Sequence, residues 1–265
     1  MKQLLEKHFG KFWLAMVFVF LYMPLLFMIV FSFNSTRQDA RFTGFSFRWY
    51  EALMKDDRIV EGFITSLKVA SVTGVLSAVL ATFAAFVLVR YRRFPGRTAF
   101  SGMVNAPLVM PEVIIGLSLL LLAVGSQNLF GWPERGLVTI ILGHTLLGMA
   151  YGMVVIQSRL LEMDRSIEEA AMDLGATPTR AFWLVMVPFL LPAIVSGALM
   201  SFTLSMDELI VTYFVYSPDA QTFPIRIFGE VKKGLNPSLN AISTLFILAT
   251  AVLVVTAEWI RARAK

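Results

Sequence analysis

Three acidic side chains lie where the sequence is otherwise apolar. Glu112 is the only charged residue in Thr98–Gln127, and Asp207 and Glu208 close another long apolar run. A carboxylate at membrane depth costs a few kcal/mol unless it faces water or a cation. A continuous helix from Thr98, rising ~1.5 Å per residue, would carry Glu112 about 21 Å into a bilayer, at or beyond its midplane. We therefore expect these acids to attract a cation. A solvated helix boundary explains Asp207 and Glu208 equally well, and a protonated core residue is the alternative for Glu112.

Aromatic and imidazole side chains add further candidates. Trp49 and Tyr50 are adjacent and would attract an alkylammonium group through their ring faces. An interfacial aromatic anchor is the commoner fate of such residues. His144 lies in another apolar run, where a hydrogen-bonded packing role is more common than a ligand role.

Two proline pairs share one spacing, Pro107 with Pro111 and Pro188 with Pro192. Each proline removes a helix hydrogen bond, and interrupted helices line the pathways of many transporters. A kink that only fits neighbouring helices is the alternative. The first pair is the more informative because the freed backbone lies beside Glu112.

Composition excludes several classes of protein. Hydrophobic residues make up 57% of the 265 residues and charged residues 15%, too apolar for a water-facing surface. The net charge of +5 lies in short clusters beside apolar runs, which argues against a nucleic-acid-binding face. The absence of cysteine and the presence of two histidines predict no metal site. No phosphate-binding loop or catalytic motif occurs, so we expect no enzyme activity and no cofactor bound to this chain.

Six apolar runs are long enough to cross a ~30 Å hydrocarbon layer as helices. They predict an all-α integral membrane protein forming one transmembrane domain over residues 1–265. The expected spans are Phe12–Phe33, Val69–Val89, Thr98–Gln127, Gly136–Ser158, a fifth that ends near Met206, and Leu239–Ala257.

Basic residues predict the orientation of these spans. The second span is followed by four arginines without an acid among them, at positions 90, 92, 93 and 97. By the positive-inside rule this short loop is cytoplasmic. Six spans then place both termini in the cytoplasm, together with the charged stretch Ser166–Pro192.

That charged stretch carries helix start and stop signals. Ser166 with Glu169 three residues later predicts a capping box, followed by a helix over Ile167–Leu174. Three residues then predict a helix end and a second start: Gly175, Thr177 and Pro178. Glycine adopts the left-handed conformation that ends a helix, threonine caps the next one, and proline suits its first position.

The same stretch resembles the EAA loop of ABC-importer permeases. Glu169-Ala170-Ala171, Gly175 and Val185-x-Val187-Pro188 fit that pattern in residue type and spacing. The resemblance implies a type I importer permease whose loop, about residues 159–181, is a cytoplasmic coupling helix that contacts an ATP-binding cassette ATPase dimer. ATP and Mg²⁺ would be bound by that partner. The implied coupling residues are Glu168, Glu169, Ala170, Ala171, Asp173, Leu174, Gly175, Ala176 and Pro188.

Further segments are similar to spermidine/putrescine importer permeases, to the second of their two permease subunits. They include Arg48-Trp49-Tyr50, the stretch from Ala106 to Glu112, and the stretch from Phe202 to Glu208. This resemblance implies a multi-pass protein of the bacterial inner membrane. Its partners would be a related permease subunit, the ATPase dimer and a periplasmic polyamine-binding protein. The implied substrate-pathway residues are Trp49, Tyr50, Glu112, Ser205, Asp207 and Glu208.

Two alternatives remain open. The same machine could carry another small cationic or amine solute. A carrier driven by an ion gradient could instead use Glu112 and His144 as a proton relay, provided that the EAA pattern is accidental.

Overall fold

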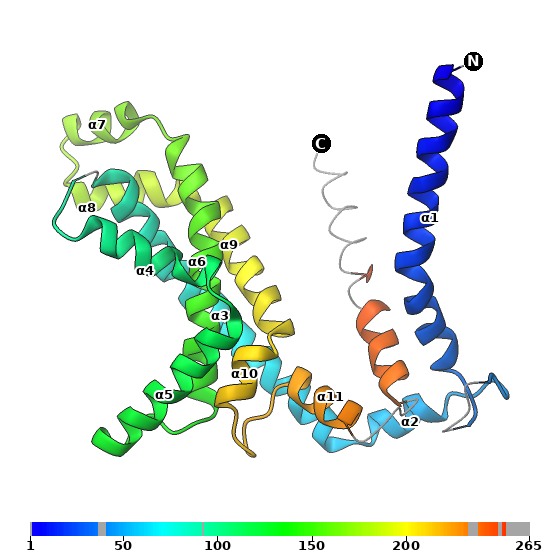
Figure 1. The fold of residues 1–265 in the computed structure, drawn as a ribbon. Coiled ribbons are helices and arrows are strands. Elements are labelled where there is room, and N and C mark those ends of the chain that lie inside the picture. The colour runs from blue at the N-terminus through cyan, green and yellow to red at the C-terminus, as the bar shows by residue number, and fades with distance from the viewer. Residues whose placement is uncertain (1, 37–40, 92, 233–237, 249–250, 253–265) are drawn as a thin grey trace. The chain divides into compact units, whose positions relative to one another are not determined.

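The computed structural model describes residues 2–36, 41–91, 93–232, 238–248 and 251–252 (Figure 1). The long elements among them are helices, and the β-bridges are isolated. The chain divides into two compact units, unit 1 from residues 1–60 and 227–265, and unit 2 from residues 61–226. A division by packing does not test whether the chain is one functional domain, which stays a prediction.

The named helices follow in chain order. They are α1 (Lys2–Phe31), α2 (Arg48–Met54), α3 (Asp57–Arg90), α4 (Arg97–Val109), α5 (Glu112–Phe130), α6 (Leu137–Leu161), α7 (Arg165–Asp173), α8 (Pro178–Ala181), the π-helical segment η1 (Phe182–Met186), α9 (Val187–Asp207), α10 (Ile210–Val215) and α11 (Phe223–Lys232).

Among the described residues, five helices are long and apolar enough to cross a membrane. They are Phe9–Phe31, Asp57–Arg90, Glu112–Phe130, Leu137–Leu161 and Pro178–Asp207. The all-helical membrane fold is thereby confirmed, with five of the six expected spans. The sixth, Leu239–Ala257, overlaps a shorter apolar helix, Ser238–Leu248, and most of its remaining residues lie outside the described chain.

The third expected span, Thr98–Gln127, is not one helix. α4 ends at Val109, Met110 is extended with ψ 138°, and α5 begins at Glu112. Pro111 lacks an N–H, and its ring pushes the preceding residue out of the helical region. Glu112 therefore lies in the first turn of α5. The expected depth of about 21 Å, which assumed one continuous helix, does not apply.

Unit 2 is held together where α3, α6 and α9 cross, and small residues line the crossing. Gly148 on α6 is so close to its neighbours that an added Cβ would meet Ser77 Oγ at 2.6 Å and Ser201 Cβ at 2.8 Å. The Ser201 hydroxyl donates to the Gly148 carbonyl at 2.9 Å, and the Ser77 hydroxyl donates to the Thr145 carbonyl at 3.2 Å. Inside a lipid bilayer the hydrophobic effect does not drive helices together. Close van der Waals contact and such hydrogen bonds hold them together instead.

The charged stretch folds as a helix, a corner and a second helix, but its cap differs from the expected one. Asp164, not Ser166, caps α7, because its carboxylate accepts a hydrogen bond from the Ser166 N–H at 2.9 Å. Aspartate caps as well as serine, and Ser166 is already inside the first turn. The predicted capping box of Ser166 and Glu169 is wrong. The hydrogen bonds from Ser166 lower the pKa of Asp164, so the charged cap weakens only as the pH falls through that lowered value.

The end of α7 matches the prediction. Gly175 has φ +91°, and its N–H donates to the Met172 carbonyl at 2.9 Å. The Ala176 N–H donates to the Ala171 carbonyl at 3.1 Å, which completes a Schellman motif. Thr177 then caps α8 by accepting from the Arg180 N–H, with Pro178 in the first turn.

The fifth expected span is a continuous helix with one widened turn. η1 is π-helical, and the Val187 N–H donates to the Phe182 carbonyl, five residues back. Pro188 follows directly and has no N–H to continue the normal ladder. The expected kink at Pro188 therefore takes the form of a π segment, while Pro192 lies inside α9.

Replacing glycine by alanine should change the stability in opposite directions at the crossing and on the open part of α5. Gly148→Ala should destabilise the protein by about 1–3 kcal/mol, because the new methyl group overpacks the crossing. Gly125→Ala on α5 makes the same chemical change where nothing lies within 4 Å, so it should be neutral or stabilise the helix by up to ~1 kcal/mol. Thermal unfolding of both variants in lipid nanodiscs would measure this. Equal melting temperatures would contradict the close crossing.

Candidate functional site

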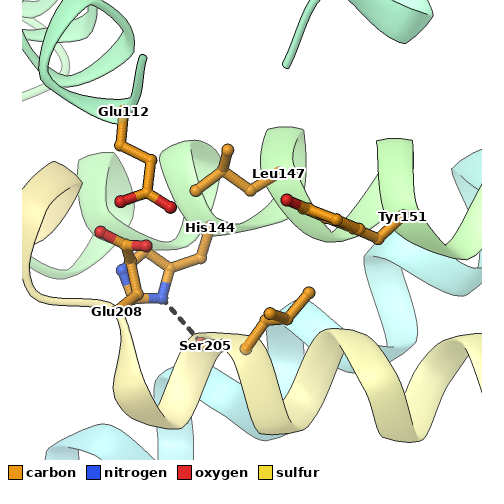
Figure 2. A pocket seen from close by; sticks show the side chains of 7 residues that line it. Glu112, His144, Leu147, Tyr151, Ser205 and Glu208 are labelled. Carbon is orange, nitrogen blue, oxygen red and sulfur yellow. Dashed lines mark hydrogen bonds between the residues drawn. The ribbon is translucent and has the colours of Figure 1, made fainter. Parts of the chain in front are cut away.

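One cleft in unit 2 gathers polar side chains from four parts of the chain (Figure 2). They come from the start of α5, from α6, from the last turns of α9, and from the segment that joins α9 to α10. The lining residues are Glu112, His144, Leu147, Tyr151, Leu204, Ser205 and Glu208. We call this the acidic cleft.

Glu208 belongs to a helix break. α9 ends at Asp207, Glu208 is extended with ψ 110°, and α10 begins at Ile210. The Glu208 carboxylate accepts a hydrogen bond from the Val211 N–H at 2.7 Å. It thereby satisfies one of the free N–H groups at the start of α10, where the helix dipole also favours a negative charge.

Glu112 lies at another helix start, in the first turn of α5. Figure 2 shows its carboxylate turned toward that of Glu208 across the cleft. Two facing carboxylates repel each other, and a cation or a proton between them removes the repulsion. This end of the cleft is therefore suited to a positive group.

His144 also lines the cleft and is 2% exposed. Its Nδ1 lies 2.7 Å from Ser205 Oγ, and its Nε2 lies 2.7 Å from Thr212 Oγ1. The interpretation of His144 as a hydrogen-bonded packing residue is confirmed. Both ring nitrogens are engaged with hydroxyl groups, and neither is hydrogen-bonded to Glu112 in the described part of the chain.

The rest of the cleft is apolar and aromatic. Leu147 and Tyr151 follow His144 at three and seven residues along α6, so the three side chains share one helix face. Figure 2 shows Leu147 between His144 and Tyr151, with Tyr151 away from the carboxylates. Leu204 completes the lining from α9. The cleft therefore offers negative charge at one end, aliphatic surface in the middle and an aromatic ring beyond it.

The structure brings together three of the expected pathway residues, Glu112, Ser205 and Glu208. Asp207 is the exposed last residue of α9 and is not part of the cleft lining. Leu147, Tyr151 and Leu204 were not predicted from the sequence. Leu147 and Tyr151 are spaced to share a helix face with His144, and Leu204 is next to Ser205. These positions are the sequence signal that could have identified all three.

Trp49 and Tyr50 lie on α2 in unit 1, and both already have partners there. Trp49 is 6% exposed, and its indole N–H donates to the Asn34 carbonyl at 2.6 Å. The Arg48 guanidinium lies 4.6 Å from the centre of the Trp49 ring. The Tyr50 hydroxyl lies 2.7 Å from Ser32 Oγ. A role for the two aromatic rings in contacting a substrate stays a prediction.

A second polar site joins α7 to the end of α3. Arg90 Nη2 lies 2.9 Å from Glu168 Oε2, and the side chains are 9% and 23% exposed. Removing one partner of a buried ion pair leaves an uncompensated charge and is strongly destabilising. Glu168 thus anchors α7 within its own chain.

The rest of α7 and its C-terminal cap are open. Glu169, Ile167 and Leu174 are exposed, and Leu174 is 90% exposed. No residue of α7 is buried. An amphipathic helix with exposed apolar side chains beside an acid is typical of a surface that contacts another protein.

Metal binding finds no support in the described residues. No group of three or more His, Cys, Asp or Glu side chains is placed to hold a metal ion there.

Comparison with known proteins gives a relative of similar length. The chain is 47% identical over 253 residues to the putrescine transport system permease protein PotI of Escherichia coli K12, covering 95% of this chain and 90% of the relative. It is 36% identical to the spermidine/putrescine transport system permease protein PotC of Haemophilus influenzae, covering 92% of this chain and 93% of the relative.

Solved structures show a similar fold at low sequence identity. A bacterial ABC transporter for import of the acidic polysaccharide alginate matches with a TM-score of 0.71 at 12% identity, over 99% of this chain and 97% of that chain. The MetNI methionine ABC transporter matches with a TM-score of 0.59 at 19% identity, over 78% of this chain and 95% of that one.

The interrupted helices around the acidic cleft and the helix-corner-helix at Gly175 lie within residues 74–264, the range that matches one family model. The chain belongs to the family of binding-protein-dependent transport system inner membrane components.

Proposed function

We propose that this chain is a permease subunit of an ATP-driven importer that moves polyamines, putrescine or spermidine, into the cytoplasm. The observation that carries the proposal is the acidic cleft, in which Glu112 and Glu208 face each other beside leucine and tyrosine side chains (Figure 2). Relatives named for putrescine and spermidine transport support the choice of cargo.

The chemistry of the cleft suits an alkyl chain with terminal ammonium groups. One ammonium group would lie between the two carboxylates and remove their repulsion. The methylene chain would lie along Leu147 and Leu204. Tyr151 would then attract a second positive group through its ring face. A small amine with one charge would use only the acidic end, and it is the second candidate cargo.

A proton relay through Glu112 and His144 has less support. Both nitrogens of His144 are hydrogen-bonded to buried hydroxyl groups. A proton-driven carrier would also give α7 no function, whereas in an ATP-driven importer α7 would contact the ATPase.

We propose that α7 is the coupling helix that contacts a cytoplasmic ATPase. The chain has no phosphate-binding loop of its own. The exposed side chains of Ile167, Glu169 and Leu174 would face the partner. Arg90 would hold α7 from behind through Glu168, and the continuous helix from Pro178 to Asp207 would carry motion toward the acidic cleft.

The same ion pair supports the expected orientation. It joins α7 to Arg90, the last residue of α3, where the arginine-rich loop begins, so both lie at one end of unit 2. The positive-inside rule assigns that end to the cytoplasm, and both termini would lie on the same side. The proposed assembly has a second permease subunit, an ATPase dimer that binds ATP and Mg²⁺, and a periplasmic polyamine-binding protein. The other predicted coupling residues on α7, Ala170, Ala171 and Asp173, would shape the contact with the ATPase.

The cargo proposal is tested by neutralising the cleft. Glu112→Gln and Glu208→Gln should each raise the KM for putrescine about tenfold or more, because a charged hydrogen bond is worth ~1.5–3 kcal/mol. Uptake of labelled putrescine and spermidine by the complex in proteoliposomes measures this. Glu134→Gln makes the same change in the exposed α5–α6 connection and should leave uptake unchanged. Equal KM values for all three variants would rule out the cleft as the cation path, and no uptake by the unaltered complex would rule out the cargo.

The coupling proposal is tested on the exposed residues of α7. Glu169→Lys should abolish uptake and leave ATP hydrolysis unresponsive to the binding protein, because the reversed charge disrupts the contact with the ATPase. ATP hydrolysis and uptake are measured on the same proteoliposomes. Arg165→Glu, a charge reversal in the first turn of α7, controls for a general effect of charge on that helix. Coupled transport by Glu169→Lys would exclude the proposed contact.

The anchoring role of Glu168 predicts a rescue. Glu168→Arg should lower the stability by at least ~1–3 kcal/mol, because it leaves the Arg90 guanidinium buried and unpaired. Adding Arg90→Glu restores an opposite pair and should recover most of the loss. Melting temperature and protease resistance at α7 are the measurements. A double variant no better than Glu168→Arg alone would show that the pair does not anchor the helix.

A further inference from the structure

Glu208 lies in the break between α9 and α10. The contacts that fix this break therefore also fix the position of its carboxylate. Three residues separate the last residue of α9, Asp207, from Val211 inside α10. Two bonds within the break are local: the Val211 N–H donates to the Glu208 carboxylate at 2.7 Å, and the Thr212 hydroxyl donates to the Glu208 carbonyl at 3.0 Å. Neither ties the break to the rest of unit 2.

His144 supplies that tie from α6. Its ring contacts Ser205 three residues before Glu208 and Thr212 four residues after it, both at 2.7 Å. One ring therefore spans the break and joins the end of α9 to the start of α10. His144, Ser205 and Thr212 are all buried, so water does not compete for these bonds.

The hydrogen-bond directions fix the form of the ring. The Thr212 hydroxyl has one hydrogen, which it donates to the Glu208 carbonyl. Thr212 Oγ1 then accepts from His144 Nε2–H, and in a neutral ring Nδ1 accepts from the Ser205 hydroxyl. Each hydrogen is donated once, and Thr212 Oγ1 both donates and accepts. The network runs without a gap from Ser205 through His144 and Thr212 to the main chain of Glu208.

Resting on the proposed function, we infer that His144 is a positioning residue for cargo recognition: it clamps the α9–α10 break and so holds the Glu208 carboxylate opposite Glu112. Ser205 and Glu208 both line the acidic cleft. A shift of the break would therefore move one of the two facing carboxylates and leave the other in place. The histidine acts through Thr212 and Ser205 and needs no contact with the cargo.

A matched set of variants separates this role from ordinary packing. Thr212→Val keeps the shape of the side chain and removes the hydroxyl, whereas Thr212→Ser keeps the hydroxyl. His144→Leu removes both bonds of the ring. Ser201→Ala is the control, because Ser201 is also buried on α9 and donates to an α6 carbonyl, one turn before Ser205.

Uptake kinetics of the reconstituted complex give the first test. His144→Leu and Thr212→Val should raise the KM for putrescine about tenfold, as expected for losing a buried hydrogen bond that positions a charged group. Thr212→Ser should stay within about twofold of the unaltered complex, and Ser201→Ala should lower the melting temperature without changing KM. KM values for His144→Leu and Thr212→Val no higher than that of Ser201→Ala would overturn the inference.

A second measurement does not depend on the cargo. The chain contains no cysteine, so Asp207→Cys gives a single site for a nitroxide label beside the break. In the full chain in lipid nanodiscs, His144→Leu and Thr212→Val should narrow the electron paramagnetic resonance lines, whereas Ser201→Ala should not. If the unaltered complex imports no polyamine, the proposed function fails and these spectra alone decide the clamp. Equal line widths in all variants would overturn it.

Discussion

A backbone hydrogen-bonding group inside a bilayer has no water to bind, so each interruption of a membrane helix must be satisfied by the protein itself. Unit 2 has two such interruptions that meet at one place, before Glu112 and around Glu208. At the second, side chains supply what the helix cannot: Glu208 accepts from a free N–H of α10, and Thr212 donates to the Glu208 carbonyl. The polar cleft follows from this constraint, because a dry, apolar break would leave those groups unpaired.

The same constraint explains why the cleft would hold a cation without trapping it. Both carboxylates lie at the starts of helices, Glu112 in α5 and Glu208 before α10. The positive end of each helix dipole stabilises the negative charge in the absence of cargo. A transported cation therefore gains less than it would from two isolated carboxylates. Transport requires such a balance, since a site that binds too tightly does not release.

The sequence predicted the features that depend on neighbouring residues. Gly175 gave the corner after α7 because glycine adopts a positive φ at no steric cost, and the apolar runs predicted the spans. Pro111 marked a break, although the span was expected to continue through it. The cap of α7 was placed on Ser166 because Glu169 follows three residues later. Asp164 is as good a cap by residue type, and only geometry decides which N–H group each side chain can reach.

The composition of the cleft depends on contacts between distant residues and could not be read in the same way. Glu112 and Glu208 were each predicted to attract a cation, but no local pattern says that they face each other. The partners of His144 lie 61 and 68 residues further along the chain. Leu147 and Tyr151 look like ordinary apolar and aromatic residues of a membrane helix until α9 is placed beside α6.

In the proposed cycle, the packing of unit 2 limits which parts can move against each other. α6 and α9 are joined by the close crossing at Gly148, so motion of α7 carried along α9 would take α6 with it. α10 packs on α5, which carries Glu112. The break at Glu208 lies between these two pairs of helices, and His144 joins them across it, so the clamp would set how far the two carboxylates separate when the ATPase closes. A cation held between them would be released when they part, which links the coupling helix to the cargo without any contact between the two sites.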